Sequence, residues 1–194
     1  MKNYIKIFFI LLLTGLILAS CDSNDDGFYN EKYVDIPDLV SIHEVDNEAG
    51  NFIFVTTSFS RYQNEPGQTT PLDLYSSTNG AASFDFNYFI EKRIAADQWE
   101  VVEIRSNMIN VELGTAESGF FVIAHATYEN QSYNYRAGIQ LPSAGEYRLS
   151  FGINSDSVDD VEFRSASIGN SLFLNINSDS HFLNSEGYYL FTTN

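Results

Sequence analysis

The hexapeptide SFDFNY, residues 83–88, alternates apolar and polar side chains with a period of two. In an extended chain, successive side chains point to opposite faces of a sheet. The polar residues Asp85 and Asn87 therefore share one face. The opposite face carries Phe84, Phe86 and Tyr88. This pattern predicts a β-strand with one buried and one solvated face.

The same alternation recurs along the chain on both sides of this stretch. It is present at residues 133–141, 145–153 and 171–177, whereas residues 52–57 and 120–128 are apolar on both faces and predict central strands. Shorter candidate strands are residues 72–75, 99–104, 109–113, 161–166 and 188–192. No window has convincing helical periodicity, and a hairpin turn is expected at Ala96-Asp97. We therefore predict an all-β fold, a single antiparallel β-sandwich of about 9–11 strands.

The segment LPSAGEYRLSF, residues 141–151, supports this fold class. It resembles the turn-Gly-x-Tyr step of immunoglobulin-like and jelly-roll domains, in which a glycine ends a turn and a tyrosine opens the next strand. Gly145 and Tyr147 occupy these two places. The resemblance implies that the Tyr147 hydroxyl is hydrogen-bonded back to the main chain, and it implies nothing about function.

The first twenty residues have the composition of a secretory signal. Lys2 and Lys6 precede an apolar run that is too short to cross a bilayer. The run ends in Leu18-Ala19-Ser20-Cys21, which resembles the lipobox of bacterial lipoproteins. That resemblance implies cleavage before Cys21 and a covalent lipid on its sulfur, which is the expected membrane anchor. Cys21 is the only cysteine, so no intramolecular disulfide can form.

The residues that follow Cys21 are acidic and contain no apolar side chain as far as Gly27. They resemble the export signal of surface-exposed lipoproteins of the Bacteroidota type, which implies an outer-membrane protein that faces the cell exterior. We expect a signal peptide at 1–20, a lipidated flexible tether at 21–32 and a β-sandwich domain at 33–194. The net charge of −16 disfavours nucleic acid as a partner.

A calcium site is one candidate for function. The pentapeptide INSDS occurs at 153–157 and again at 176–180, each time at the end of an alternating strand. If the strands are neighbours, the loops could supply oxygen ligands for Ca²⁺. The ligands would be Asn154, Asp156, Asp159, Asp160 and Asp179. The plainer explanation is that Asn, Ser and Asp recur because they suit strand ends.

A glycan-binding platform is a second candidate. Aromatic residues make up 15% of the chain, and exposed rings can stack on sugars. The candidate residues are Trp99, Tyr128, Tyr133 and Tyr135. The plainer explanation is that tyrosine suits a half-buried strand, and Tyr133 and Tyr135 share the apolar face of theirs.

Enzymatic motifs are weak. The three histidines are far apart, and no G-x-S-x-G nucleophile elbow is present. A hydrolase is therefore a distant alternative, and no catalytic residue or cofactor is assigned. We expect a non-enzymatic lipoprotein that serves as an accessory subunit or protein-interaction module of an outer-membrane complex. The alternative is a lipoprotein that binds an extracellular glycan or another ligand for a nutrient-uptake system.

Overall fold

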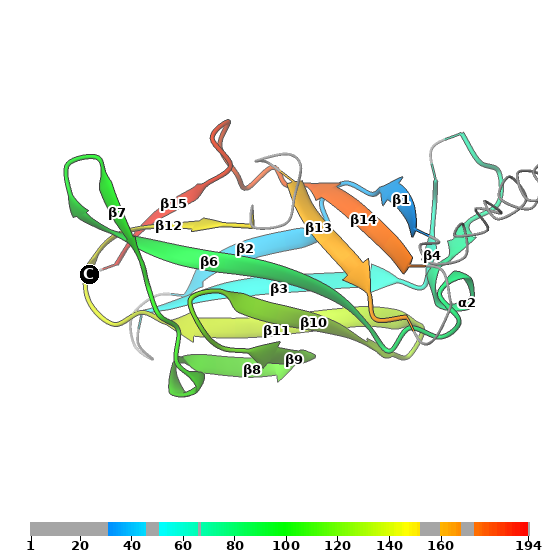
Figure 1. Ribbon diagram of the computed structural model, residues 1–194, viewed down its shortest axis with the longest axis horizontal. Helices are drawn as coiled ribbons and strands as arrows, with labels where there is room; N and C mark the ends of the chain where they lie inside the picture. The colour runs from blue at the N-terminus through cyan, green and yellow to red at the C-terminus, as the bar shows by residue number, and fades with distance from the viewer. Residues whose placement is uncertain (1–30, 46–50, 66, 152–159, 168–172, 194) are drawn as a thin grey trace, which may run out of the picture. The chain divides into compact units, whose positions relative to one another are not determined.

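The computed structural model describes residues 31–45, 51–65, 67–151, 160–167 and 173–193 (Figure 1). The strands are β1 (Glu31–Asp35), β2 (Val40–Val45), β3 (Phe52–Ser60), β4 (Tyr62–Gln63), β5 (Leu72–Asp73), β6 (Ser83–Ala95), β7 (Gln98–Val101), β8 (Ile109–Leu113), β9 (Thr115–Glu117), β10 (Val122–Glu129), β11 (Ser132–Gln140), β12 (Gly145–Ser150), β13 (Asp160–Ser165), β14 (Phe173–Asp179) and β15 (Tyr189–Thr193). The helical elements are α2 (Leu74–Ser77) and a 3₁₀ turn, η2 (Ser106–Met108). No helix in the described ranges has the length and hydropathy needed to span a bilayer.

The prediction of an all-β fold is confirmed. Thirteen of the described strands form one mixed, curled sheet whose main order is β1-β14-β13-β6-β10-β11-β3-β2, and β4 pairs only with β5. β1 and β14 are parallel, whereas the other pairs are antiparallel. The sheet resembles a half-barrel, and a division into the two separate layers of an antiparallel sandwich is not evident.

The long strand β6 is the reason that the sheet does not divide. Its first half pairs with β10 through six residues and with β13 through two. Its second half pairs with β12 and β7. Figure 1 shows β6 in green, running from β13 and β10 to the end of the sheet that carries β7, β12 and β15. β6 thus joins the strands β10 and β13 to the strands β7 and β12 in one sheet.

The connection between β1 and β2 brings the two ends of the sheet together. Ile36 and Asp38 donate backbone hydrogen bonds of 3.0 Å to the carbonyl oxygens of Asn177 and Asp179 on β14. Asp38 has a φ of 55°, which turns the chain toward β2. The sheet therefore curls because its first and last strands in the main order are consecutive in the chain.

The hairpin β8–β9 is inserted where β10 and β11 separate. β9 pairs with β10, and β8 pairs with β11. Gly114 lies at the turn with a φ of +73°, and a Cβ atom there would lie 2.4 Å from the carbonyl oxygen of His125. Only glycine fits this position, because it alone lacks the Cβ and adopts positive φ without steric cost.

The core is an aromatic cluster on the inner face of the curled sheet. Its members come from β3, β6, β11 and β13 and from the residue that follows β12. They are Phe59, Phe84, Phe86, Tyr88, Tyr133, Tyr135, Phe151 and Phe163. Phe86 contacts the Phe163 and Tyr135 rings at centroid distances of 4.8 and 5.4 Å. The alternation of residues 83–88 thus predicted the inner face of β6.

Two local predictions are confirmed. The hydroxyl of Tyr147 donates a 2.6 Å hydrogen bond to the carbonyl oxygen of Ser143, as the turn-Gly-x-Tyr motif implies. The hairpin between β6 and β7 turns at Ala96-Asp97, where Asp97 has a φ of 57°.

Three predictions of elements need correction. The expected strand at 72–75 ends after two residues, because the Asp73 side chain caps α2 by accepting a hydrogen bond from the Ser76 backbone. Residues 120–128 are not covered on both faces, since Phe120 and Phe121 are 64% and 41% exposed. β1 begins at Glu31, inside the range expected for the tether.

Candidate functional site

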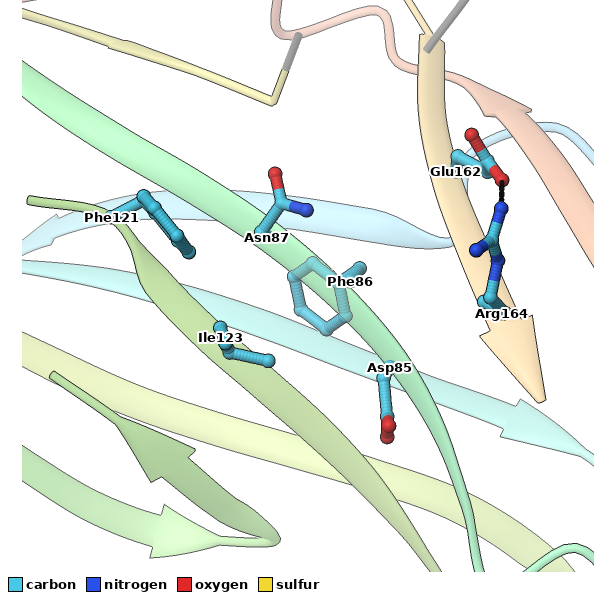
Figure 2. A pocket seen from close by; sticks show the side chains of 7 residues that line it. All are labelled: Asp85, Phe86, Asn87, Phe121, Ile123, Glu162 and Arg164. Atoms are coloured by element: carbon cyan, nitrogen blue, oxygen red, sulfur yellow. Dashed lines mark hydrogen bonds and ion pairs between the residues drawn. The ribbon is translucent and has the colours of Figure 1, made fainter. Parts of the chain in front are cut away.

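A groove lies on the outer face of the sheet, above β6 and between β10 and β13 (Figure 2). Its volume is about 220 Å³. The lining residues are Asp85, Phe86, Asn87, Phe121, Ile123, Glu162 and Arg164. β13 pairs with β6 only at positions 84 and 85, and β12 pairs with it only at positions 89–92. Among the described residues, positions 86–88 therefore have no partner strand on that edge.

The base and one side of this groove follow from strand register. Asp85 and Asn87 point outward because they alternate with the buried residues of β6. Ile123 on β10 lies directly opposite Asn87. Phe121, just before β10, adds a ring that is 41% exposed. The β10 side of the groove is thus apolar, and its base on β6 is polar.

The opposite side of the groove is charged. Arg164 Nη2 donates a 3.3 Å hydrogen bond to Glu162 Oε1, and the Arg164 side chain is 57% exposed. On the base of the groove, the Asn87 Oδ1 atom is buried and has no hydrogen-bond partner within the described part of the chain. A buried oxygen without a donor is unfavourable by about 1–3 kcal/mol. A ligand that donates a hydrogen bond would relieve this cost once the Asn87 side chain turns its amide oxygen into the groove.

The groups around Asp85 do not form a catalytic triad. Asp85 Oδ1 accepts a 2.7 Å hydrogen bond from Ser83 Oγ and lies 2.9 Å from His125 Nδ1. His125 Nε2 lies 3.5 Å from Glu117 Oε1. In a triad the histidine contacts the serine hydroxyl in order to remove its proton. Here Ser83 contacts the carboxylate, so this arrangement lacks the contact between nucleophile and base.

A second candidate surface covers the outer face of the four strands β7, β6, β12 and β15. Strand pairing aligns Val101 with Glu91, Glu91 with Arg148, and Arg148 with Leu190. The row therefore crosses all four strands. We call this row and two neighbouring rings the Arg148 surface. It consists of Glu91, Trp99, Val101, Arg148, Tyr188 and Leu190.

Arg148 is held in one position at the centre of the Arg148 surface. It forms two hydrogen bonds with the buried Glu91 carboxylate, at 2.5 Å from Nε and 3.0 Å from Nη2. Its guanidinium carbon lies 4.6 Å from the ring centroid of Trp99 and 3.9 Å from that of Tyr188. The hydrogen bonds to Glu91 raise the pKa of Arg148 above its ordinary value. Trp99 and Tyr188 are therefore ordered by a shared, permanently charged partner.

Apolar side chains are exposed beside this ordered centre. Leu190 is 57% exposed and Val101 is 39% exposed. A hollow of about 280 Å³ lies beside Leu190. It is lined by Arg93, Trp99, Glu146, Tyr147, Leu190, Phe191 and Thr192. Arg93 is itself paired with Glu146 at 2.6 Å, so the charges of this face are largely compensated within the protein.

The structure changes the predicted tyrosine platform. Tyr133 and Tyr135 are fully buried; their hydroxyls contact the Ala81 carbonyl oxygen at 3.1 Å and the Tyr88 hydroxyl at 2.9 Å. They belong to the core and cannot stack on a sugar. Tyr128 is partly exposed and stacks on Tyr75 at a centroid distance of 4.4 Å. The Tyr128 ring also lies 5.0 Å from the buried Tyr133 ring, whereas Trp99 lies on the Arg148 surface, so the four predicted residues do not form one exposed platform.

The predicted calcium site is only partly within the described residues. Asn154, Asp156 and Asp159 lie outside them. Asp160 on β13 and Asp179 on β14 are directly opposite each other in the strand register. β14, which contains most of the second INSDS segment, thus lies beside β13, whereas residues 153–157 of the first segment lie outside the described residues. Within the ranges that are described, no group of three or more His, Cys, Asp or Glu residues is placed to hold a metal ion.

Cys21 and the tether up to Asn30 also lie outside the described residues. Lipidation of Cys21 and the position of the chain relative to a membrane therefore stay predictions.

Sequence reasoning missed most of the residues that form the groove and the Arg148 surface. Alternation indicated that Asn87 and Arg148 point outward, but not what they contact. Phe121 and Ile123 were assigned to a covered strand, since two aromatic residues followed by aliphatic ones are typical of buried strands. One signal could have indicated that Phe121 is exposed: it directly follows Gly119-Phe120, in the bend that precedes β10.

The chain was compared with known proteins at three levels. No protein-family model matches it, no curated protein is significantly similar to it, and no solved structure matches its fold significantly.

Proposed function

We propose that the protein is a non-enzymatic lipoprotein that acts as an accessory subunit of an outer-membrane protein complex. A lipid on Cys21 holds it at the outer membrane, and the acidic tether that follows directs it to the cell exterior. The resemblance to lipobox and export sequences supports this location. As a finer fold assignment, we propose a relationship to immunoglobulin-like or jelly-roll sandwiches, which the hydrogen bond from Tyr147 to Ser143 supports.

The observation that carries the proposed role is the Arg148 surface. Tryptophan, tyrosine and arginine are the residues that most often dominate the free energy of protein–protein binding. Here one of each is stacked together on an outward face. Because Glu91 and the stacking already order Arg148, binding costs little additional side-chain entropy.

The chemistry of this surface favours a protein as the partner. Leu190 and Val101 expose apolar area that a protein surface can cover. The ion pairs Arg148–Glu91 and Arg93–Glu146 are satisfied internally, so they need no opposite charge from the partner. The overall charge of −16 disfavours nucleic acid and anionic lipid surfaces.

A membrane pull-down with the full acylated chain tests this proposal. We expect the wild-type protein to co-purify from detergent-solubilised membranes with a discrete membrane-protein partner. Trp99→Ala removes a ring from the Arg148 surface and should reduce recovery of the partner by about tenfold or more. Mass spectrometry of the mature N-terminus tests the lipid on Cys21 separately.

Tyr62→Ala is the matched control. Tyr62 is 51% exposed, and its ring also contacts an arginine, Arg61, at 5.2 Å. Tyr62 lies on β4, at the other end of the sheet from β7 (Figure 1). Recovery should be unchanged in this variant. Isolation of the wild-type protein as a clean monomer, or equal losses in both variants, would reject the proposed role.

A further inference from the structure

The groove of Figure 2 combines an apolar side with a polar base. The Phe121 ring and Ile123 form the apolar side, and Asp85 and Asn87 form the base. The CH groups on one face of a sugar ring pack against the negative face of an aromatic ring, while its hydroxyls need hydrogen bonds at the edge. A groove with an exposed aromatic ring beside polar groups offers both the stacking surface and the hydrogen bonds.

The hydrogen-bonding groups of the groove favour a ligand that donates. Asn87 Oδ1 is a buried acceptor without a partner among the described residues. Ser83 and His125 both contact the Oδ1 atom of Asp85, which leaves Oδ2 without a partner among the described residues and therefore as a further acceptor. Arg164, more than half exposed at the other side, adds donors. Hydroxyl groups match this set because each of them both donates and accepts.

Charge determines which sugars fit. Asp85 and Glu162 both line the groove, and the single guanidinium of Arg164 is already bonded to Glu162. The chain as a whole carries −16. A ligand carboxylate or sulfate would be repelled by Asp85 and by the overall negative charge, because the charge of Arg164 is already balanced by Glu162. A neutral ligand avoids this cost.

The size of the groove limits the ligand to one ring. About 220 Å³ is smaller than the roughly 300–1,000 Å³ of pockets that enclose a drug-sized molecule. Because the groove lies on the outer face of the sheet, the remainder of a longer chain could extend into solvent. We propose that this groove binds one ring of a neutral saccharide, with the sugar stacked on Phe121 and its hydroxyls bonded to Asn87 and Asp85.

This inference is independent of the proposed docking role. The groove lies over the first half of β6, whereas the Arg148 surface lies over its second half, and they share no residue. A failure of the membrane pull-down would leave saccharide binding intact, and the reverse also holds.

Saturation-transfer NMR on the full chain tests the inference. The chain is kept in a zwitterionic detergent without a sugar headgroup, so that the detergent cannot occupy the groove. The probes are the methyl glycosides of glucose, galactose, mannose and xylose, and neutral oligosaccharides built from them. Each is titrated to about 10 mM, because a single ring offers too few atoms for tight binding. We expect at least one neutral probe to receive saturation from the protein, and we expect the same probe to shift the side-chain amide resonances of Asn87 in a ¹⁵N–¹H correlation spectrum of the labelled chain.

Two neighbouring phenylalanines provide the variant and its control. Phe121→Ala should weaken binding of that probe by about tenfold or more, since stacking is lost. Phe120→Ala removes an even more exposed ring that does not line the groove, and it should change the Kd by less than about twofold. Both substitutions are at exposed positions, and circular dichroism verifies that both variants fold.

Three results would overturn the inference. The first is an absence of binding by every neutral probe. The second is an equal loss of affinity in the two variants. The third is binding of glucuronate as tight as that of the methyl glucoside, which would show that the groove does not select neutral ligands.

Discussion

The two faces of β6 differ in what their side chains contribute. Every second residue from Phe84 to Ile90 is buried, and the rings of Phe84, Phe86 and Tyr88 contact aromatic rings from other parts of the sheet. On the opposite face, Asp85 and Asn87 in the first half and Glu91 in the second contact other polar or charged groups or line the groove. One strand thus supplies the core from one face and both candidate binding surfaces from the other. The comparison indicates that stability and binding can be changed separately by substituting adjacent residues.

The largest effect is expected from Phe86→Ala on the inner face. Phe86 is 2% exposed and contacts rings from β11 and β13. Its removal leaves a cavity, which we expect to lower the free energy of unfolding by about 3–5 kcal/mol. Chemical denaturation monitored by fluorescence measures this change. A loss of less than about 1 kcal/mol would mean that the inner face of β6 does not form the core.

An intermediate effect is expected from Tyr135→Phe. The Tyr88 and Tyr135 hydroxyls lie 2.9 Å apart in the core. Removal of one leaves the other buried without this partner, and should lower the free energy of unfolding by about 1–3 kcal/mol at neutral pH. Tyr33→Phe is the control, because Tyr33 is 54% exposed, and it should leave the stability unchanged.

The same tyrosines predict how stability depends on alkaline pH. Burial raises the pKa of Tyr135 to about 12, from an ordinary value of 10.0, and it raises the pKa of Tyr88 as well. Between these values the unfolded chain loses the proton while the folded chain keeps it. The protonated Tyr135 hydroxyl therefore makes its full contribution to the free energy of unfolding below pH 10, and this contribution is lost as the pH rises toward 12. Denaturation at several alkaline pH values should show a steeper loss in the wild type than in Tyr135→Phe.

Period-two alternation predicted the inner face well because it is a local property. Phe84, Phe86 and Tyr88 follow from their own spacing, without knowledge of any other strand. The turn at Asp97 and the hydrogen bond of Tyr147 were also predicted, since each depends on only a few neighbouring residues.

The outer face was predicted poorly because its contacts are not local. Arg148 meets Glu91 across 57 residues of sequence, and Trp99 reaches it only because β7 and β12 flank the same strand. Alternation indicated that Arg148 points outward, but the strand order decides which side chains are its neighbours. The buried positions of Tyr133 and Tyr135 follow from alternation, which already favoured the core over a platform.

The smallest effect on stability is expected from Asn87→Ala, one residue from Phe86 but on the opposite face. The substitution removes the buried Oδ1 atom that has no partner among the described residues. Since a desolvated acceptor is lost together with its side chain, the free energy of unfolding should stay within about 0.5 kcal/mol of the wild type or rise slightly. The saccharide affinity should nevertheless fall, because the donor from the ligand has lost its acceptor. Denaturation and NMR titration of the same preparation measure both quantities.

A large loss of stability would show that Asn87 supports the fold, and an unchanged affinity would show that it does not contact the ligand. Only unchanged stability with weaker binding fits a polar residue that β6 keeps unpaired for a ligand.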